Sequence, residues 1–428
     1  MTTSVLDRPS SQEPGTIPAV VNLGLLGFGT IGSAVARLSR AAAADLHRRG
    51  VAPVVRAALV RNAGRSRSSA ALTPLLTSDV DQFFAAPIDL VVEALGNAEP
   101  ARTFVARALE SGIPVVTANK TLVAAHGDEL FALARQRGTA LRYEATCLAG
   151  VPFLGTFERR PLAARVRGVT GILNGTSNAI LSALSSGITF ETALADAQRR
   201  GLAEPDPSND VSGADAAQKL AILVRLFGER SVDAAQIPAT PLDAVDVDDV
   251  FAAAAFGGHI KPLACASWTG DTVRAFVSPT FVDDSHALAR VSHVTNGVVL
   301  EAEGGRRCFI GPGAGPDVTA ATLLDDVVEI ATERPPVVST RAGRAASVEH
   351  FESGWFVRIP GDAPEAEIAE LLGSFGVWCA RLSRIRDRRY ALTFRATRER
   401  ATAATAALAA ATHAVVVAVP AVTGDTEC

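Results

Sequence analysis

One short motif near the N-terminus constrains the fold most. Gly27-Phe28-Gly29-Thr30-Ile31-Gly32 follows an apolar stretch, 20–26, that predicts a strand, and precedes an alanine-rich stretch that predicts a helix running to about Arg49. In a strand–turn–helix unit, the first glycine permits the tight turn, the second lets the backbone approach a pyrophosphate, and the third lets helix and strand pack closely. The helix N-terminus then favours phosphate charge. The motif predicts dinucleotide binding, although glycines required only for packing would give the same pattern.

Strands and helices alternate through the first third of the chain. The expected strands are 20–26, 54–60, 88–95, 113–118 and 141–145, and the expected helices include 101–111 and 122–137. This alternation implies parallel βαβ units. We therefore predict an α/β fold that begins with a Rossmann-type doubly wound parallel sheet.

The later segments have other patterns. Between 149 and 318 we expect helices at 177–201 and 213–228 and strands at 272–282 and 298–310, which favours an α+β domain. The last segments, in βαββαβ order, predict a ferredoxin-like fold: 355–359, 365–375, 377–384, 389–395, 400–411 and 414–419.

These patterns divide the chain into five parts. We expect a disordered tail, 1–20; a Rossmann-type domain, 21–148; an α+β domain, 149–334; a linker, 335–347; and a ferredoxin-like domain, 348–424. The last helix of the α+β domain is expected to pack back on the Rossmann-type domain.

Charge and apolar patterning exclude several classes of protein. The chain has 41 Lys and Arg against 45 Asp and Glu and no basic run with interleaved aromatics, so we expect no nucleic-acid partner. The longest uncharged apolar stretch, 414–422, is far shorter than the roughly 20 residues that cross a bilayer. The first twenty residues lack the apolar core of a secretory signal, which predicts a cytoplasmic protein without a membrane partner. The scattered cysteines predict neither disulfides nor structural zinc.

The end of the second strand favours one dinucleotide over the other. NAD-binding folds usually place a carboxylate there for the ribose 2′-hydroxyl. This chain instead carries Arg61, Arg65 and Arg67 and no acidic residue nearby. Guanidinium groups form charge-assisted hydrogen bonds with phosphate. NADP(H) is therefore expected over NAD(H), with solvated loop arginines as the alternative.

The few lysines are chemically informative. Lys120, Lys219 and Lys261 are the only lysines in the sequence, and Lys120 follows the strand 113–118 at the edge where such sheets bind ligands. Asp215 and Lys219 are four residues apart on an expected helix and share one face. Apolar neighbours indicate a mostly buried helix, so an ammonium there needs a partner or a function. The alternative is a simple surface ion pair between i and i+4.

Eight motifs in order resemble the homoserine dehydrogenase family, whose members reduce aspartate semialdehyde to homoserine with NAD(P)H. The motifs are GLLGFGTIG, VVEALGNAEPA, VVTANKTLVAAHGDEL, YEATCLAGVP, GILNGTSNAIL, GLAEPDPSNDVSGADAAQK, HIKPLA and GPGAGPDVTA. The resemblance implies NADPH-dependent reduction of L-aspartate 4-semialdehyde to L-homoserine in threonine and methionine biosynthesis. It also implies that 149–334 is a catalytic and dimerisation domain, in a homodimer or tetramer.

The resemblance also implies roles for individual residues. Lys219 corresponds to the proton donor, Asp215 and Glu204 to binders of the substrate ammonium group, and Lys120 to the second active-site lysine. The positions that correspond to cofactor or substrate contacts are Gly27, Gly29, Thr30, Ile31, Gly32, Lys120, Gly201 and Gly315. A sodium ion, held mostly by backbone carbonyls, corresponds to Glu144, Cys147, Ala149 and Val151.

Departures from the family pattern leave other interpretations open. Asn97 and Ala179 stand where other residues are usual, which would suit a paralogue that acts on a different small amino- or carboxy-aldehyde. A non-catalytic NADP-binding regulator is a second alternative, although it would need no proton donor. The C-terminal segment resembles an ACT domain, but Glu365 replaces the glycine of the usual ligand-binding turn. Weak or absent regulation by threonine is therefore expected.

Overall fold

The computed structural model describes residues 19–65, 75–158, 165–332, 343–349, 351–360 and 363–422. Several predictions concern residues outside these ranges. They are the tail up to residue 18, Arg67, most of the linker, and the Gly361-Asp362 part of the ACT-like turn.

The N-terminal sheet is six-stranded, parallel and ordered β3-β2-β1-β4-β5-β6, as in dinucleotide-binding folds. Its strands are β1 (Ala19–Leu26), β2 (Val51–Leu59), β3 (Leu75–Thr77), β4 (Leu90–Glu93), β5 (Val115–Thr117) and β6 (Leu141–Arg142). Leu25, Val91 and Val116 are fully buried, because helices cover both faces of the sheet. The predicted doubly wound sheet is confirmed.

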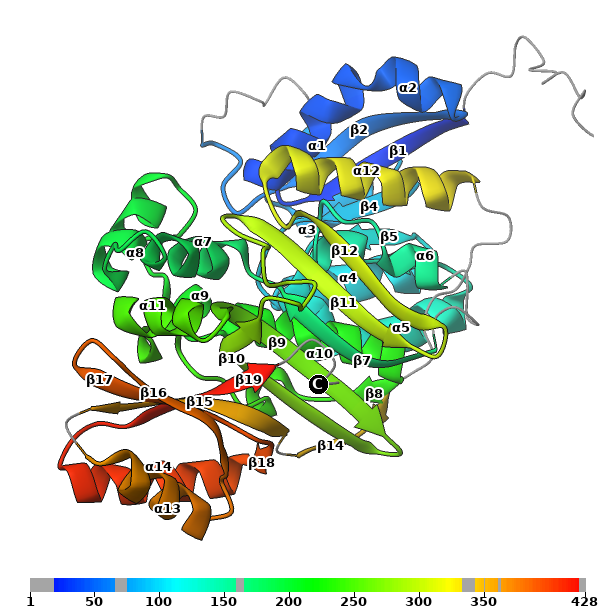
Figure 1. Cartoon of the computed structure of the whole chain (residues 1–428). Coiled ribbons are helices and arrows are strands. Elements are labelled where there is room, and N and C mark those ends of the chain that lie inside the picture. The colour runs from blue at the N-terminus through cyan, green and yellow to red at the C-terminus, as the bar shows by residue number, and fades with distance from the viewer. Residues whose placement is uncertain are drawn as a thin grey trace, which may run out of the picture.

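The helices of this region are α1 (Thr30–Ala41), α2 (Ala43–Arg48), α3 (Val80–Phe84), α4 (Ala101–Glu110) and α5 (Lys120–Arg137). The expectation of one helix to about Arg49 is wrong, because the backbone leaves helical geometry at Ala42. A helix from much later in the chain, α12 (Pro316–Thr332), lies beside α1 (Figure 1). Its Leu323 and Val327 join the apolar core that contains Val35.

A second, eleven-stranded sheet occupies the rest of the molecule. Its first part contains β7 (Val166–Ile172), β9 (Gly258–Thr269), β10 (Thr272–Asp283), β11 (Thr295–Ala302) and β12 (Gly305–Pro312). β7 and β9 were not expected, and the single strand expected at 298–310 is a hairpin that turns between β11 and β12. β14 (Ser347–Glu349) pairs with β10, and β8 (Arg230–Ser231) pairs separately with β13 (Arg344–Ala345).

Helices pack beside this second sheet. They are α6 (Leu154–Glu158), α7 (Gly175–Leu184), α8 (Phe190–Arg199), α9 (Ser208–Val211), α10 (Ala214–Gly228) and α11 (Val247–Ala255), with 3-10 turns η2 (Glu144–Thr146), η3 (Ala234–Gln236) and η4 (Leu242–Ala244). The single helix expected over 177–201 is wrong, since the chain turns at Gly187, whose φ of +81° suits glycine.

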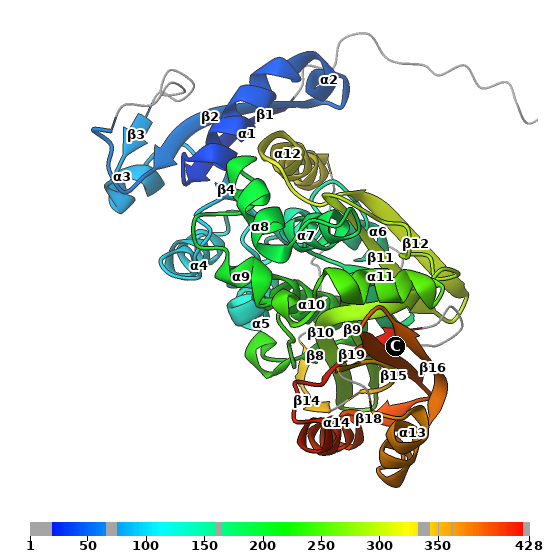
Figure 2. The same cartoon turned by 60° about the vertical axis from the view of Figure 1, so that its left-hand side comes forward.

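The C-terminal segment has the ferredoxin-like arrangement. Its elements are β15 (Glu352–Pro360), α13 (Glu365–Ser374), β16 (Cys379–Ile385), β17 (Arg388–Thr393), β18 (Ala396–Thr397), α14 (Arg398–Thr412) and β19 (Val417–Val422). The main strands are antiparallel in the order β19-β15-β17-β16. Figure 2 shows this part at the end of the molecule opposite the N-terminal sheet. β19 also pairs in parallel with β10, so the two parts share one continuous sheet.

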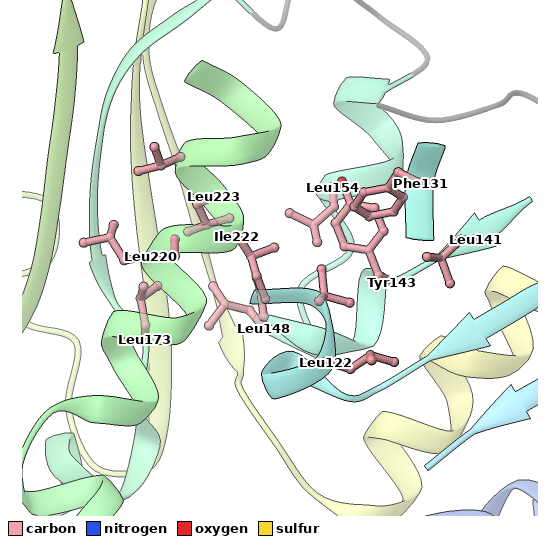
Figure 3. Packing of buried hydrophobic residues seen from close by; sticks show 14 of the residues in the cluster. Leu122, Phe131, Leu141, Tyr143, Leu148, Leu154, Leu173, Leu220, Ile222 and Leu223 are labelled. Carbon is pink, nitrogen blue, oxygen red and sulfur yellow. The ribbon is translucent and has the colours of Figure 1, made fainter. Parts of the chain in front are cut away.

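Helix α10 lies at the centre of the largest apolar core. Leu220, Ile222 and Leu223 of α10 are buried beside Leu148 and Leu173, as Figure 3 shows. Full burial of each such side chain stabilises the fold by about 1.5–3 kcal/mol. The residues on the polar side of α10 are therefore held on a helix with little freedom to move.

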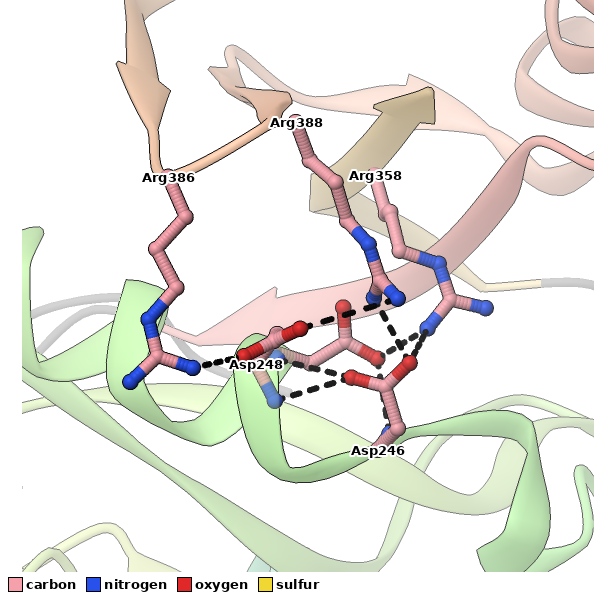
Figure 4. A network of polar contacts seen from close by, with 6 residues as sticks. Asp246, Asp248, Arg358, Arg386 and Arg388 are labelled. Atoms are coloured by element: carbon pink, nitrogen blue, oxygen red, sulfur yellow. Dashed lines mark hydrogen bonds and ion pairs between the residues drawn. The ribbon is translucent and has the colours of Figure 1, made fainter. Parts of the chain in front are cut away.

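An ionic cluster joins α11 to the C-terminal segment (Figure 4). Arg358 Nη1 lies 2.9 Å from Asp246 Oδ2 and 2.6 Å from Asp249 Oδ2, and Arg388 Nη1 lies 2.6 Å from Asp246 Oδ2. Asp246 and Asp249 also form the capping box of α11, so the same carboxylates begin the helix and bind the arginines.

Candidate active site

The glycine turn after β1 has the geometry of a dinucleotide-binding loop. Gly27 has φ +98°, and a Cβ there would lie 2.8 Å from the carbonyl oxygen of Ala94. A Cβ at Gly32 would lie 2.1 Å from the carbonyl oxygen of Gly27, so α1 packs against the turn only because residue 32 is glycine. In the described parts of the chain, no heavy atom other than those of Gly29 and its chain neighbours lies within 4 Å of a Cβ built on Gly29. Open space over Gly29 fits a pyrophosphate, and the exposed Thr30 and half-buried Ile31 begin the helix beside it.

A buried carboxylate organises the neighbouring strand ends. Glu93, at the end of β4, is fully buried and accepts hydrogen bonds from Thr117 Oγ1, from the Leu95 amide and from Asn119 Nδ2. Burial raises the pKa of Glu93 above its usual range, against the effect of these donors. Asn119 in turn accepts from the Leu122 amide and caps α5. This network fixes the start of α5 and therefore the position of Lys120.

Two lysines meet at one carboxylate. Asp215 Oδ2 lies 2.9 Å from Lys219 Nζ, one helical turn away on α10, and Asp215 Oδ1 lies 3.1 Å from Lys120 Nζ on α5. The Asp215 side chain is 9% exposed, that of Lys219 11% and that of Lys120 37%. The simple surface pair considered from the sequence is therefore wrong, and Lys120 is the ammonium group more open to a ligand.

The remaining partners hold this cluster in place. Lys219 Nζ donates to the carbonyl oxygen of Leu173 at 2.7 Å, and Asn174 Nδ2 donates to Asp215 Oδ2 at 2.9 Å. Asn174 Nδ2 also lies 2.7 Å from Asp210 Oδ1. Burial alone would raise the pKa of Asp215, but the two ammonium groups outweigh it and lower the pKa to about 2. Asp215 is thus an anion throughout the neutral range and can hold cationic groups.

Comparison with known proteins decides the family. Residues 27–144 match the model of the homoserine dehydrogenase NAD-binding domain, and residues 152–328 match the homoserine dehydrogenase model. The homoserine dehydrogenase of Corynebacterium glutamicum is 39% identical over 334 residues, which are 76% of this chain and 75% of that protein. That of Bacillus subtilis is 34% identical over 314 residues, 72% of each chain. The chain belongs to the homoserine dehydrogenase family. It is an NAD(P)-dependent oxidoreductase that acts on a CH–OH group.

Solved structures agree with this family. The crystal structure of a homoserine dehydrogenase from Thiobacillus denitrificans has a TM-score of 0.84 at 30% identity and covers 95% of this chain and 99% of that one. A hyperthermophilic archaeal homoserine dehydrogenase in complex with NADPH has a TM-score of 0.62 at 25% identity and covers 73% of this chain and 98% of that one. The two family models end before the ferredoxin-like segment.

Other predicted homoserine dehydrogenase positions lie on loops and turns outside α5 and α10. Gly201, with φ +69°, follows α8, and Glu204 lies in the exposed loop beyond it. Among the described residues, no hydrogen bond or ion pair joins the Glu204 carboxylate to the cluster. Arg61 and Arg65 are exposed just beyond β2, and Gly315, with φ +139°, precedes α12.

The predicted sodium positions fit a cation only in part. The Glu144 carboxylate accepts hydrogen bonds from the amides of Phe153, Leu154 and Gly155, so it serves the start of α6. Burial raises the pKa of Cys147 to about 12, which keeps its thiol protonated. The atoms that could coordinate a cation at these positions are therefore backbone carbonyl oxygens. The carbonyl oxygen of Ala149 already accepts a hydrogen bond from the Thr322 hydroxyl. Among the described residues, no group of three or more His, Cys, Asp or Glu side chains could hold a metal.

Two residues of the cluster were not selected from the sequence. Asn174 and Asp210 both belong to motifs quoted above, NGT and SND, yet neither was given a role. An asparagine directly before a helix signals a cap, and Asn174 caps α7 through the Ser177 amide. Its second role, with Asp215, depends on a contact 41 residues away and has no local signal.

Proposed function

We propose that this chain interconverts L-aspartate 4-semialdehyde and L-homoserine with NADP(H) as the preferred cofactor, for threonine and methionine biosynthesis. The observation that carries the proposal is the single buried carboxylate shared by Lys120 and Lys219. When bound, the nicotinamide cofactor supplies or accepts the hydride at the carbon that bears the oxygen. The chain's own residues must then handle the proton and the charges of the amino-acid substrate.

Lys219 is proposed as the proton donor. Hydride addition to the aldehyde carbon leaves negative charge on oxygen, and a positioned general acid supplies the proton as that charge develops. Asp215 and the Leu173 carbonyl fix the ammonium group of Lys219 from two directions. In the oxidative direction Lys219 must start as the neutral amine, which takes the proton from the hydroxyl and becomes the ammonium group. Lys219 therefore acts on the oxygen that changes charge.

The other charged residues are proposed to bind the substrate. Asp215, as a permanent anion, attracts the substrate ammonium group, and Glu204 on the neighbouring loop adds a second carboxylate. Lys120 is more exposed than Lys219 and is fixed at the start of α5. It suits the substrate carboxylate or a second contact to the reacting oxygen and to the cofactor.

The glycine turn and Arg61 and Arg65 are proposed to hold NADP(H). The open space over Gly29 supports pyrophosphate binding, and the exposed guanidinium groups beyond β2 support a 2′-phosphate. Absence of an acidic residue from 60–65 supports the same choice.

The assay that tests this function offers aspartate semialdehyde with NADPH and homoserine with NADP⁺ to the purified chain. Turnover of both, with homoserine preferred over shorter and longer hydroxy-amino acids, is expected. Turnover of another aldehyde alone would favour the paralogue, and binding of NADPH without turnover would favour the regulator.

Assembly, ion binding and location are proposed separately. We propose a homodimer or tetramer in the cytoplasm, with the divisions at 21–148, 149–334 and 348–424 as its domains. None of the described helices is long and apolar enough to cross a bilayer. A sodium ion, if bound, would be held by carbonyls near Glu144 and Val151. Light scattering tests the assembly, and a melting temperature that differs between sodium and choline chloride tests the ion.

A further inference from the structure

We propose that a cavity between the catalytic half and the ferredoxin-like segment is a binding site for a small aliphatic or hydroxy monocarboxylate. The cavity has a volume of about 120 Å³ and lies between β10 on one side and β15, β19 and α14 on the other. An engineered apolar cavity of about 150 Å³ admits a molecule the size of benzene. The ligand is therefore an acid of only a few carbon atoms.

One cation and a set of hydroxyls face this cavity. Arg398, the first residue of α14, lines it, and the described residues offer its guanidinium group no hydrogen bond or ion pair. Ser353, 5% exposed, also lines it, and its hydroxyl has no hydrogen-bond partner within the described ranges. Thr402 is one turn along α14 from Arg398. Ser353 is buried, Arg398 half-buried and Thr402 exposed. Guanidinium and hydroxyl groups can donate hydrogen bonds to a ligand's oxygen atoms.

The opposite wall is apolar. Phe276 and Phe351 meet edge to face with ring centroids 5.2 Å apart, and both are buried. Trp355 donates its indole N–H to the carbonyl oxygen of Ala396, so its ring contributes an apolar surface to the cavity. Pro238 and Pro420 complete this side. The wall suits the hydrocarbon part of a short acid.

The charges of the lining discriminate between classes of acid. Among the residues that the structure describes, no aspartate or glutamate lines the cavity, whereas Arg398 supplies a positive charge. A monocarboxylate would be neutralised there, but the ammonium group of an α-amino acid would be desolvated without an anion. We therefore expect 2-oxo, 2-hydroxy or plain aliphatic acids to bind more tightly than amino acids of the same carbon skeleton.

The test measures binding by calorimetry and thermal shift on the full chain, without cofactor or turnover. The probes are 3-methyl-2-oxobutanoate, 3-methylbutanoate and valine, which share a carbon skeleton. Arg398→Ala is expected to weaken binding of the two acids about tenfold or more, the usual effect of losing a charge-assisted contact. Thr402 is an exposed helix residue that lines the cavity. Thr402→Leu places a larger apolar side chain there and is expected to abolish binding of the two acids.

Arg400→Ala is the matched control, because Arg400 is on the same helix but does not line the cavity. It should bind both acids as the wild type does. Binding that survives Arg398→Ala would belong to another site, such as the substrate site, and would overturn the proposal. Failure of the wild type to bind either acid, or tighter binding of valine, would also overturn it. None of these outcomes depends on the proposed dehydrogenase activity.

Discussion

Lys120 and Lys219 bind opposite oxygens of the same carboxylate, although they are 99 positions apart in the sequence and belong to different helices. The start of α5, at the carboxyl ends of the strands of the N-terminal sheet, is thereby joined to α10 through Asp215. Because one lysine is buried and the other half-exposed, replacing each of them is expected to change kcat and KM differently.

Lys219→Ala should lower kcat at saturating substrate by about 10²–10⁴-fold, the usual contribution of a general acid. Lys120→Ala should raise KM for homoserine more than it lowers kcat. Steady-state kinetics in both directions measure this, with NADPH binding followed by fluorescence.

Lys261→Met serves as the control for losing a buried lysine. Lys261 donates to the carbonyl oxygen of Val291, and no described contact joins it to Asp215. The kcat of the Lys261→Met variant should therefore be near normal. Near-normal kcat in Lys219→Ala with a loss of about three orders of magnitude in Lys120→Ala would reverse the two roles.

Arg61→Ala should reduce the preference for NADPH over NADH. The loss of a charge-assisted contact to the 2′-phosphate corresponds to roughly ten- to hundredfold in kcat/KM, mainly through KM for NADPH. Kinetics with NADH should hardly change. Arg48→Ala, exposed and paired with Asp45, is the control. Equal use of both cofactors by the wild type would refute the assignment.

Threonine should inhibit weakly or not at all. α13 begins with the exposed Glu365, and Glu367 adds a second negative charge in its first turn, where a ligand carboxylate would approach. Inhibition curves with threonine and direct calorimetry measure this on the full chain. Saturable inhibition that disappears in Glu365→Arg would contradict the expectation.

Stability should fall as pH rises through the range in which Asp249 ionises. Burial raises the pKa of Asp249 to about 6 from a usual 3.8, despite the opposing effect of Arg358. The unfolded chain therefore loses its proton first, and ionisation disfavours the folded state between about pH 4 and pH 6. A pKa difference of this size between the folded and unfolded chain corresponds to about 3 kcal/mol in the free energy of unfolding.

Asp249→Asn should remove that dependence. The free energy of urea unfolding, wild type minus variant, is expected to fall by about 2–3 kcal/mol from about pH 4 to pH 7. Asp248→Asn, whose carboxylate binds Arg386, is the neighbouring control. A difference that stays flat across this range would show that Asp249 is ionised in both states.

Local signals predicted the parts of the fold in which strands and helices follow a regular order along the chain. The glycine motif, the βα alternation and the βαββαβ order gave the N-terminal sheet and the ferredoxin-like segment. Predictions failed where a turn divides a regular pattern, as at Ala42 and Gly187. β7 was missed because its partners, β9 and β11, lie far along the chain. β9 was missed although it forms a hairpin with β10, because its apolar run resembles a buried helix.

The candidate site was also predicted only in part. Asp215 and Lys219 share a helix, so spacing alone placed them together. The contact of Lys120 with Asp215 needs two helices to cross, and no local periodicity reports that crossing. The shared carboxylate, rather than any single residue, is what the structure adds.

The order of strands in the second sheet also bears on how the chain is made. β19, the last strand of the described chain, lies between β10 and β15 and pairs with Phe281 and Val282 of β10. A nascent chain that has not yet released Val417 from the ribosome therefore has every residue of the lysine–aspartate cluster, but β10 has an edge that is open at Phe281 and Val282. Such edges pair readily with other chains. Synthesis of β19, not formation of the active-site residues, is the step that closes this edge.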